Sequence, residues 1–371
     1  MKKFLVLVAL VVVTLLGVLV VELYRPYSNY SGTVIVEISP GTSAMNVAKI
    51  LVERGVLEYR VPFLFRYVLG RPRNSLKAGE YNFDHPLRPI DVYRKMVEGE
   101  VRLFTVVIPE GSDRFDMARI FHDRLGIDPD EFLRLTQTAA AIRDLDPKAP
   151  TLEGYLFPDT YRFAKNATAA RAVEAMLTRE RQVLKEKFAV ELKDPEQNLH
   201  EVVTLASLVE KETSDPSERP LIAGVFARRL KIGLPLACDP TVIYAARLDG
   251  RMLEHPLPPI HESDLQFKSP YNTYQHAGLP PGPIASPGEA SLRAAFHPAQ
   301  SEALYFVSNN HGGHIFSKTL AEHLRNVARY RRQVAEIRRQ ESQPTSAPKT
   351  KALKSRGGNG TKKKSAQRAR H

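Results

Sequence analysis

The chain has almost no cysteine: its 371 residues contain one, Cys238. A single cysteine excludes an intramolecular disulfide and any zinc site built from several cysteines. No neighbouring motif orients a base toward Cys238, and a lone thiol is most often a small buried hydrophobe. We therefore assign Cys238 no catalytic role.

Signatures of several common chemistries are also missing. The sequence has no glycine-rich phosphate loop, no dinucleotide-binding fingerprint and no Ser-His-Asp ordering, so nucleotide and acyl-transfer chemistry are poorly supported. His311, His314 and His323 lie close together, but Gly312-Gly313 interrupts any helix. Short zinc sites usually have helical His-x3-His spacing. We predict a hairpin turn there, with no metal and no cofactor.

The N-terminus carries an uncharged run, Phe4 to Val21, between Met1-Lys2-Lys3 and Glu22. As a helix this run spans about 27 Å, close to the thickness of a bilayer's hydrocarbon core. It has neither the short apolar region nor the Ala-x-Ala exit of a cleaved signal peptide, which favours a permanent single-pass anchor. Because Lys2 and Lys3 favour the cytoplasmic side, everything after Tyr24 is expected on the extracytoplasmic, or periplasmic, side of the cytoplasmic (inner) membrane.

Acidic residues are scarce at the other end, residues 341–371. This segment holds nine Lys or Arg against one acid, Glu341, and so carries eight of the twelve net positive charges. With almost nothing to bury, it is predicted to be a disordered basic tail. The anchor argues against nucleic acid as a partner, so anionic lipid or cell-wall polymer is the expected counter-charge. A tail that only aids solubility is the alternative.

A strand-turn-helix pattern occurs twice, seventy residues apart. In the first copy a strand-like segment, Thr33 to Ile38, precedes a turn and a helix, and in the second copy Phe104 to Ile108 does the same. The apolar positions of the two helices match one for one: Val47, Ala48, Ile50 and Leu51 in the first, and Met117, Ala118, Ile120 and Phe121 in the second. Two copies indicate duplication rather than a solenoid, which needs three or more.

Helical patterns dominate after Leu103. The predicted helices cover residues 113–125, 130–140, 168–188, 195–211, 219–230 and 320–339. Residues 239–287 are rich in Pro, Gly and Tyr and predict a loop-heavy stretch, and residues 304–316 predict a hairpin. The predicted fold class is therefore α+β, with an N-terminal transmembrane helix, a small βα module and a larger, mainly helical domain whose loops shape the site.

Near its end, the helix predicted at 195–211 places a glutamate, Glu210, on an apolar face. His200, Thr204, Ser207 and Lys211 share one polar stripe, whereas Glu210 shares its face with Val203 and Ala206. We expect Glu210 to be partly desolvated, with a raised pKa that suits proton donation near neutral pH. The alternative is a frayed helix end with Glu210, Lys211 and Glu212 all in solvent.

Several further segments follow Glu210 in a fixed order. They are Asp239-Pro240-Thr241, Ser269-Pro270-Tyr271-Asn272, Gly278 to Pro283, His297-Pro298, Leu304 to Val307 and Gly312-Gly313-His314, and Glu153 to Tyr161 precedes them. With these motifs the chain resembles the MltG, or YceG-like, family of membrane-anchored endolytic murein transglycosylases, from the anchor to about Arg332. The family often has a polar pair before Asp-Pro-Thr, where this chain has Ala237-Cys238, so we assign those two positions no role.

The resemblance implies an enzyme, a lytic murein transglycosylase, with Glu210 as the catalytic acid. It implies cleavage of the MurNAc-GlcNAc bond of nascent peptidoglycan strands to give 1,6-anhydro-MurNAc ends, which would terminate strand elongation beside membrane-bound synthases. It also implies the domain division: a cytoplasmic stub and anchor at 1–24, a LysM-like module at 25–102, a YceG-like catalytic domain at 103–340 and the tail at 341–371. For the LysM-like part, a simple spacer is an equal alternative.

Substrate-binding candidates come from the motifs around the acid. Tyr271, Asn272, Tyr274 and Thr241 are expected to position sugar, because tyrosine offers an apolar face and a hydroxyl, and Asn272 could bind an N-acetyl group. Their turn chemistry is the competing explanation.

Other residues near the motifs compete with Glu210 or assist it. Glu212 is the rival catalytic acid. Glu153 and Tyr161 are further candidates for positioning substrate, and Asp239 is predicted to cap a helix or turn. The alternative functions are a non-catalytic peptidoglycan-binding scaffold for wall synthases and a hydrolase on the same substrate.

Overall fold

The computed structural model describes residues 1–70, 75–252, 257 and 260–341. Nearly all of the predicted basic tail lies outside these residues, so that prediction stays untested. The fold is mixed α+β and about half helical. The described residues contain three two-stranded antiparallel sheets, and the rest of the regular structure is helical.

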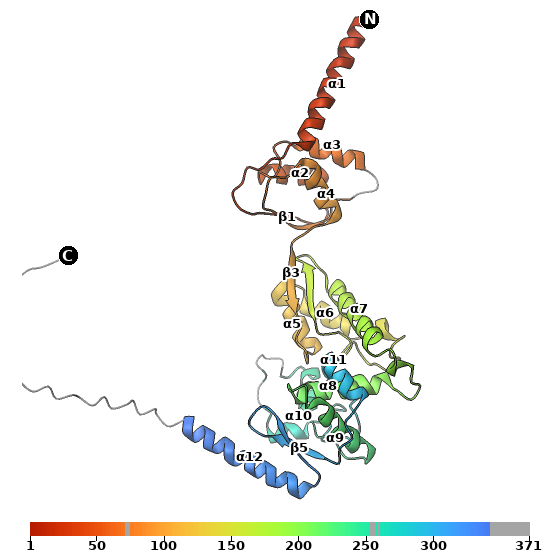
Figure 1. The fold of residues 1–371 in the computed structure, drawn as a ribbon, viewed down its shortest axis with the longest axis vertical. Helices are drawn as coiled ribbons and strands as arrows, with labels where there is room; N and C mark the ends of the chain where they lie inside the picture. Colours follow the sequence, from red (N-terminus) through yellow and green to blue (C-terminus); the bar gives the residue numbers. More distant parts are fainter. Residues whose placement is uncertain (71–74, 253–256, 258–259, 342–371) are drawn as a thin grey trace, which may run out of the picture.

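The first helix, α1 (Lys2–Tyr24), projects from one end of the molecule (Figure 1). It is long and apolar enough to cross a membrane. Along α1, which the structure describes throughout, only Leu23 is buried. This exposure fits a membrane anchor better than a core helix, because a core helix would bury its apolar side chains.

A small module follows α1 and has its own hydrophobic core. Its elements are β1 (Val34–Ile38), α2 (Ala44–Glu53), α3 (Arg60–Gly70), β2 (Gly79–Phe83) and α4 (Pro89–Glu98). Strands β1 and β2 are antiparallel, with Val36 opposite Tyr81. The most buried side chains of this core include Val36, Val47, Leu51, Phe63, Tyr81, Phe83 and Met96. The alternation along β1 points Val36 and Ile38 inward, into this core beside α2.

The larger body begins with the second copy of the repeat, which the structure confirms. Strand β3 (Leu103–Val107) leads through a turn into α5 (Arg114–Leu125), as β1 leads into α2, and β3 pairs with β4 (Thr160–Ala164). Gly41 and Gly111 occupy matching left-handed positions, at φ 81° and 73°. A polar side chain caps each helix, Ser43 for α2 and Asp113 for α5. Local sequence therefore specified both turns.

The remaining elements build the rest of the body around a second core. They are α6 (Pro129–Thr136), η1 (Ala140–Ile142), α7 (Ala169–Lys187), η2 (Glu191–Lys193), α8 (Leu199–Glu212), α9 (Arg219–Lys231), α10 (Asp239–Leu248), η3 (Glu262–Gln266), α11 (Glu289–Phe296), β5 (Tyr305–Ser308), β6 (His314–Ser317) and α12 (Leu320–Glu341). Helix α8 is the central element, because it packs against α9, α10 and α11.

Some predicted boundaries were wrong for identifiable reasons. The helix expected at 130–140 ends at Thr136, and η1 follows separately. The loop-heavy stretch contains α10, because Pro240 lies in the first turn, where its missing N–H costs no hydrogen bond. Asp239 does not cap this helix: it is the first helical residue, Cys238 holds the N-cap position, and the Asp239 carboxylate accepts a hydrogen bond from Tyr274.

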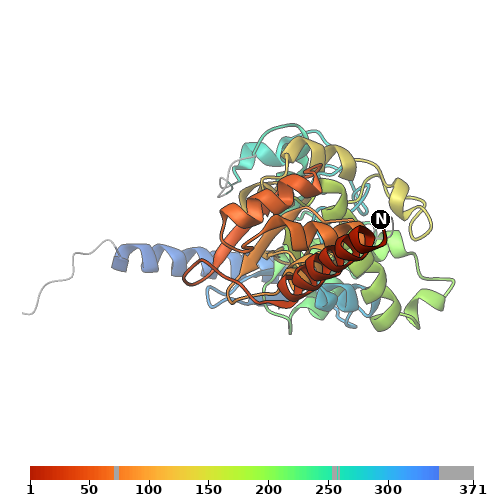
Figure 2. The same ribbon diagram turned by 90° about the horizontal axis from the view of Figure 1, so that it is seen from above.

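The whole molecule is elongated. Figure 1 places the small module between α1 and the larger body, with α12 near the far end. Seen from above in Figure 2, α12 extends sideways from the rest of the chain, while its first turns contact β5 and β6. The site is therefore carried by the body, well separated from α1.

Candidate active site

Glu210 lies near the C-terminal end of helix α8. Residues Val202 to Val209 are all buried, including Thr204 and Ser207, whose hydroxyls donate to the backbone carbonyls of His200 and Thr204. The middle of the expected polar stripe is thus internal and satisfied by the helix itself, whereas its ends, His200 and Lys211, bond to Asp146 and to the carbonyl of Gly111. Glu210 comes at the end of this buried run, and its side chain is 5% exposed.

Two donors from the starts of other helices hold the Glu210 carboxylate. Its Oε1 accepts from Nη2 of Arg219, at 2.9 Å, and its Oε2 accepts from the backbone N–H of Gly288, also at 2.9 Å. Arg219 is the first residue of α9, and Gly288 is the N-cap of α11. The helices that pack on α8 therefore supply one charged and one neutral donor to the same carboxylate.

The surroundings of Glu210 favour its protonated form. Burial is the largest cause and raises the pKa of Glu210. Three donors lower this pKa: the N–H of Gly288, the Ser291 hydroxyl and Arg219. The Glu110 charge raises it. The net shift of this pKa is upward. A carboxyl with a raised pKa and good donors for its charged form can give up a proton and take one back.

A surface depression of about 460 Å³ lies over this carboxylate. Its lining comes from the β3–α5 turn, the end of α8 and the start of α9: Glu110, Gly111, Glu210, Lys211, Glu212, Thr213, Ser214 and Arg219. Lys211 spans the depression and donates to the carbonyl of Gly111 at 3.0 Å. The acid therefore has an open space beside it that a substrate could enter.

Glu212, the rival acid, has a different partner. Its Oε1 accepts from Sγ of Cys238 at 3.0 Å. Burial raises the pKa of Glu212, the hydrogen bond from Cys238 lowers it, the Asp239 charge raises it, and His314 and Arg229 lower it, with a net upward shift. Glu212 lines the first depression and also a second one of about 460 Å³, which contains Asp239, Tyr274 and Tyr305. Glu212 therefore lies between the two depressions as a lining residue of both.

Two of the predicted substrate-binding residues organise the protein interior. Asn272 is 0% exposed, and its amide donates to the carbonyls of Leu265 and Phe267, at 3.0 and 2.7 Å. Thr241 is also 0% exposed and donates to the carbonyl of Cys238 at 2.6 Å. The structure places both side chains behind the surface, where they fix the loop and the start of α10.

The predicted tyrosines differ from one another in position. Tyr271 is buried edge-on against Tyr244, with ring centroids 5.2 Å apart, and burial raises the pKa of its hydroxyl to about 12. Tyr274 is half-buried, lines the second depression and donates to Asp239 at 2.5 Å. Tyr161, on β4, donates to the carbonyl of Phe157 and stacks on Phe163. Of the three, Tyr274 faces a depression that includes a candidate acid.

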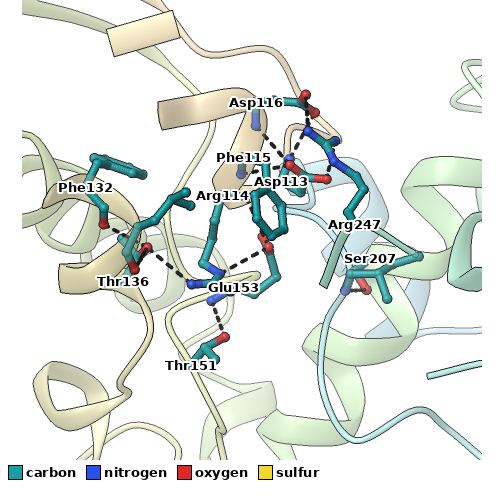
Figure 3. A network of polar contacts seen from close by, with 12 residues as sticks. Asp113, Arg114, Phe115, Asp116, Phe132, Thr136, Thr151, Glu153, Ser207 and Arg247 are labelled. Carbon is teal, nitrogen blue, oxygen red and sulfur yellow. Dashed lines mark hydrogen bonds and ion pairs between the residues drawn. The ribbon is translucent and has the colours of Figure 1, made fainter. Parts of the chain in front are cut away.

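Glu153 belongs to a buried ionic network at the start of α5 (Figure 3). Its carboxylate accepts from the backbone N–H of Arg114 at 3.1 Å and pairs with the Arg114 guanidinium at 3.6 Å. Burial is the main cause that raises the pKa of Glu153. Beside it, Arg247 of α10 pairs with Asp113 and Asp116 at 2.5 and 3.1 Å. This network anchors the turn that carries Glu110.

Three residues of the site were missed by the sequence analysis: Glu110, Arg219 and Gly288. Arg219 and Gly288 carry no motif of their own. Glu110 did leave a signal, because the two copies of the repeat differ there. The first copy has Pro40 before its turn glycine and the second has Glu110, a carboxylate where the turn itself needs none.

Comparison with known proteins shows the family of this chain. A model of the YceG-like family matches residues 36–329. The chain is 31% identical over 313 residues to the endolytic murein transglycosylase of Bacillus subtilis, covering 80% of this chain and 85% of that protein. It is 29% identical over 330 residues to the protein of the same name from Streptococcus pneumoniae D39, of whose length it spans 59%.

A solved structure is similar as well. The crystal structure of a YceG-like protein from Listeria monocytogenes is 31% identical, with a TM-score of 0.54, and covers 80% of this chain and 99% of that one. The fold and site define a mixed α+β protein with an apolar N-terminal helix and a shielded glutamate beside a surface depression. The chain belongs to the YceG-like family.

Proposed function

We propose that this chain is an endolytic murein transglycosylase in which Glu210 is the catalytic acid and base. The observation that supports it most directly is the position of Glu210, whose side chain is 5% exposed, is held by Arg219 and Gly288, and lines a depression of about 460 Å³. The relatives from Bacillus and Streptococcus bear the same activity in their names.

The chemistry needs one carboxyl group. Protonated Glu210 gives its proton to the glycosidic oxygen as the bond from that oxygen to C1 of N-acetylmuramic acid breaks. The C6 hydroxyl of the same sugar then bonds to C1 and returns its proton to the Glu210 carboxylate, which leaves a 1,6-anhydro end. No water enters the products. Arg219 and the N–H of Gly288 stabilise the carboxylate between the two steps.

Helix α1 gives the enzyme its location. We propose that α1 anchors the chain in the cytoplasmic membrane and that the body lies on the outer side, so that it cuts nascent strands near membrane-bound synthases and limits their length. The small module has a separate core and stands between α1 and the body. We propose that it is LysM-like and contacts glycan; a spacer is the alternative role.

Product analysis of full-length protein in detergent micelles tests this function. Uncross-linked glycan strands are incubated with wild type and with Glu210→Gln, and the strand ends are weighed by mass spectrometry. We expect anhydro ends from wild type, and loss of about 10²- to 10⁴-fold in rate for Glu210→Gln. Reducing ends would indicate a hydrolase, and bound but uncut strands would indicate a scaffold.

A further inference from the structure

Two carboxylates share a single nitrogen of Arg219. Nη2 lies 2.9 Å from Oε1 of Glu210 and 3.3 Å from Oε2 of Glu110. The Arg219 side chain is 7% exposed, whereas that of Glu110 is 48% exposed. Contact with one nitrogen brings the two carboxylates within the roughly 4–6 Å over which charges shift one another's pKa.

Gly288 contacts both carboxylates as well. Its N–H donates to Glu210, and a Cβ at this position would lie 1.9 Å from Oε1 of Glu110. Glycine here leaves just enough space for the Glu110 carboxylate to sit against the backbone. The start of α11 is therefore shaped around Glu110 as well as around Glu210.

The turn that carries Glu110 is held on both sides. Gly111 donates to the carbonyl of Ser286 at 2.9 Å, and Ser286 donates back to Ser112 at 2.9 Å. Lys211 donates to the carbonyl of Gly111, and Asp113, next to the turn, is paired with Arg247. These bonds fix the backbone of Glu110 relative to α8 and α11, so its carboxylate reaches Arg219 from a rigid support.

The charges around Glu210 come from four segments. Arg219 of α9 and Glu110 of the β3–α5 turn contact each other beside Glu210, and Lys211 and Glu212 follow Glu210 on α8. On α11, Glu289 is directed to Arg293 and Lys187. Burial is the largest cause of the raised pKa of Glu210, and the Glu110 charge acts in the same direction, against Arg219.

We propose that Glu110 is a positioning residue for the acid: it shares Arg219 with Glu210, so the guanidinium does not fully neutralise Glu210, and the acid keeps the proton that it donates. The inference rests on the proposed function. Without Glu110, Arg219 would serve Glu210 alone and favour its carboxylate form. With Glu110 present, Arg219 keeps a partner whether Glu210 is charged or neutral.

The pH dependence of kcat/KM tests this role in the full-length protein. Glu110→Gln removes the second charge, so the pKa of Glu210 should fall. The alkaline limb of the profile should then move to lower pH by a fraction of a pH unit, because Glu110 is half-exposed and its charge is partly screened. At pH values above the limb, cleavage would drop about two- to threefold, with little change at lower pH. Glu110→Asp keeps the charge and should restore a profile close to wild type.

Glu289→Gln is the matched control, because it removes a carboxylate next to Gly288 that does not contact Arg219. Its profile should overlie wild type. Gly288→Ala is a second probe, since it displaces the Glu110 carboxylate without changing its charge. It should shift the limb in the same direction as Glu110→Gln. Thermal melts of every variant identify any that fail to fold.

Two results would overturn the inference. One is a Glu110→Gln profile that overlies wild type. The other is loss of cleavage at every pH in both Glu110→Gln and Glu110→Asp, which would make Glu110 a direct participant. If wild type cleaves nothing, the proposed function fails, yet the shared arginine is still tested by ¹³C NMR titration of the Glu210 carboxyl. That signal, assigned by its absence in Glu210→Gln, should titrate at lower pH in Glu110→Gln.

Discussion

Glu210 and Glu212 show how two carboxylates on one helix end acquire different surroundings. Burial raises the pKa of both. Glu210 receives a backbone N–H and a guanidinium, whereas Glu212 receives the thiol of Cys238, a weak donor. An acid that must also act as a base needs support for its charged form, and Glu210 has more of it.

This contrast predicts the outcome of replacing Glu212. Glu212→Gln should retain anhydro products, with kcat lowered by less than about tenfold, because the proton donor and its partners are untouched. The measurement is the rate of anhydro-end formation, with Glu210→Gln assayed in parallel. Abolished cleavage in Glu212→Gln together with an active Glu210→Gln would reverse the assignment of the acid.

Asn272 supports a second prediction at the residue scale. Asn272→Ala removes the amide donor of the part-buried Phe267 carbonyl and one of the two amide donors of the Leu265 carbonyl, which should lower the free energy of unfolding by about 1–3 kcal/mol. Gln275→Ala is the control, since Gln275 donates to the same Leu265 carbonyl from an exposed position. Chemical denaturation measures both. Unchanged stability with weaker glycan binding would favour the role in sugar recognition instead.

At the scale of elements, helix α7 contains a buried glutamate, Glu180, to which the proposed reaction assigns no role. Glu180 is 1% exposed, and its Oε1 has no hydrogen-bond partner among the described residues. Burial raises the pKa of Glu180 to about 8. A carboxyl group whose pKa is higher in the folded state destabilises that state as pH rises, since the folded state then binds more protons than the unfolded one.

Glu180→Gln should therefore stabilise the protein in a defined pH range. Below the ordinary glutamate value of 4.5 both proteins carry a neutral side chain, so their melting temperatures should differ little. Between pH 4.5 and 8 the advantage of the variant should grow, and above pH 8 it should level off at a few kcal/mol, about 1.4 for each pKa unit. Melting curves across pH check this, and a constant difference would contradict it.

The whole molecule consists of two cores joined by a narrow polar contact. Lys165, beyond β4, reaches Glu80 of β2 at 2.7 Å and Glu37 of β1 at 3.6 Å. Arg102 also donates its backbone N–H to the Glu80 carbonyl. Because few groups among the described residues connect the cores, the angle between the small module and the body is expected to depend on this contact.

Lys165→Ala should widen the range of that angle with little change in melting temperature, because each core is intact. Distances between one spin label on α2 and one on α7 would show a broader distribution in the variant. Lys49→Ala, which breaks an exposed pair within α2, is the control and should leave the distribution unchanged. Identical distributions for Lys165→Ala and wild type would mean that backbone contacts alone set the angle.

The amino-acid sequence by itself determined the features that depend on local patterns. The apolar run gave α1, the matched apolar positions gave the two strand-turn-helix units, and the period of α8 placed Glu210 on a buried face. These predictions succeed because hydrophobic periodicity and turn chemistry depend on residues that are close together in the sequence. The short α10 was missed, since Pro240 reads as a helix breaker unless it falls in the first turn.

Tertiary structure decided what surrounds the acid. Glu110, Arg219 and Gly288 meet Glu210 from three other segments, and no pattern near α8 specifies which charges arrive there. Asn272 and Thr241 show the same dependence on tertiary structure. Their motifs suggested sugar binding, but the surrounding segments bury both side chains completely. Local sequence can bury one face of a helix, but only long-range packing selects its neighbours, and those neighbours set the protonation of a carboxyl group.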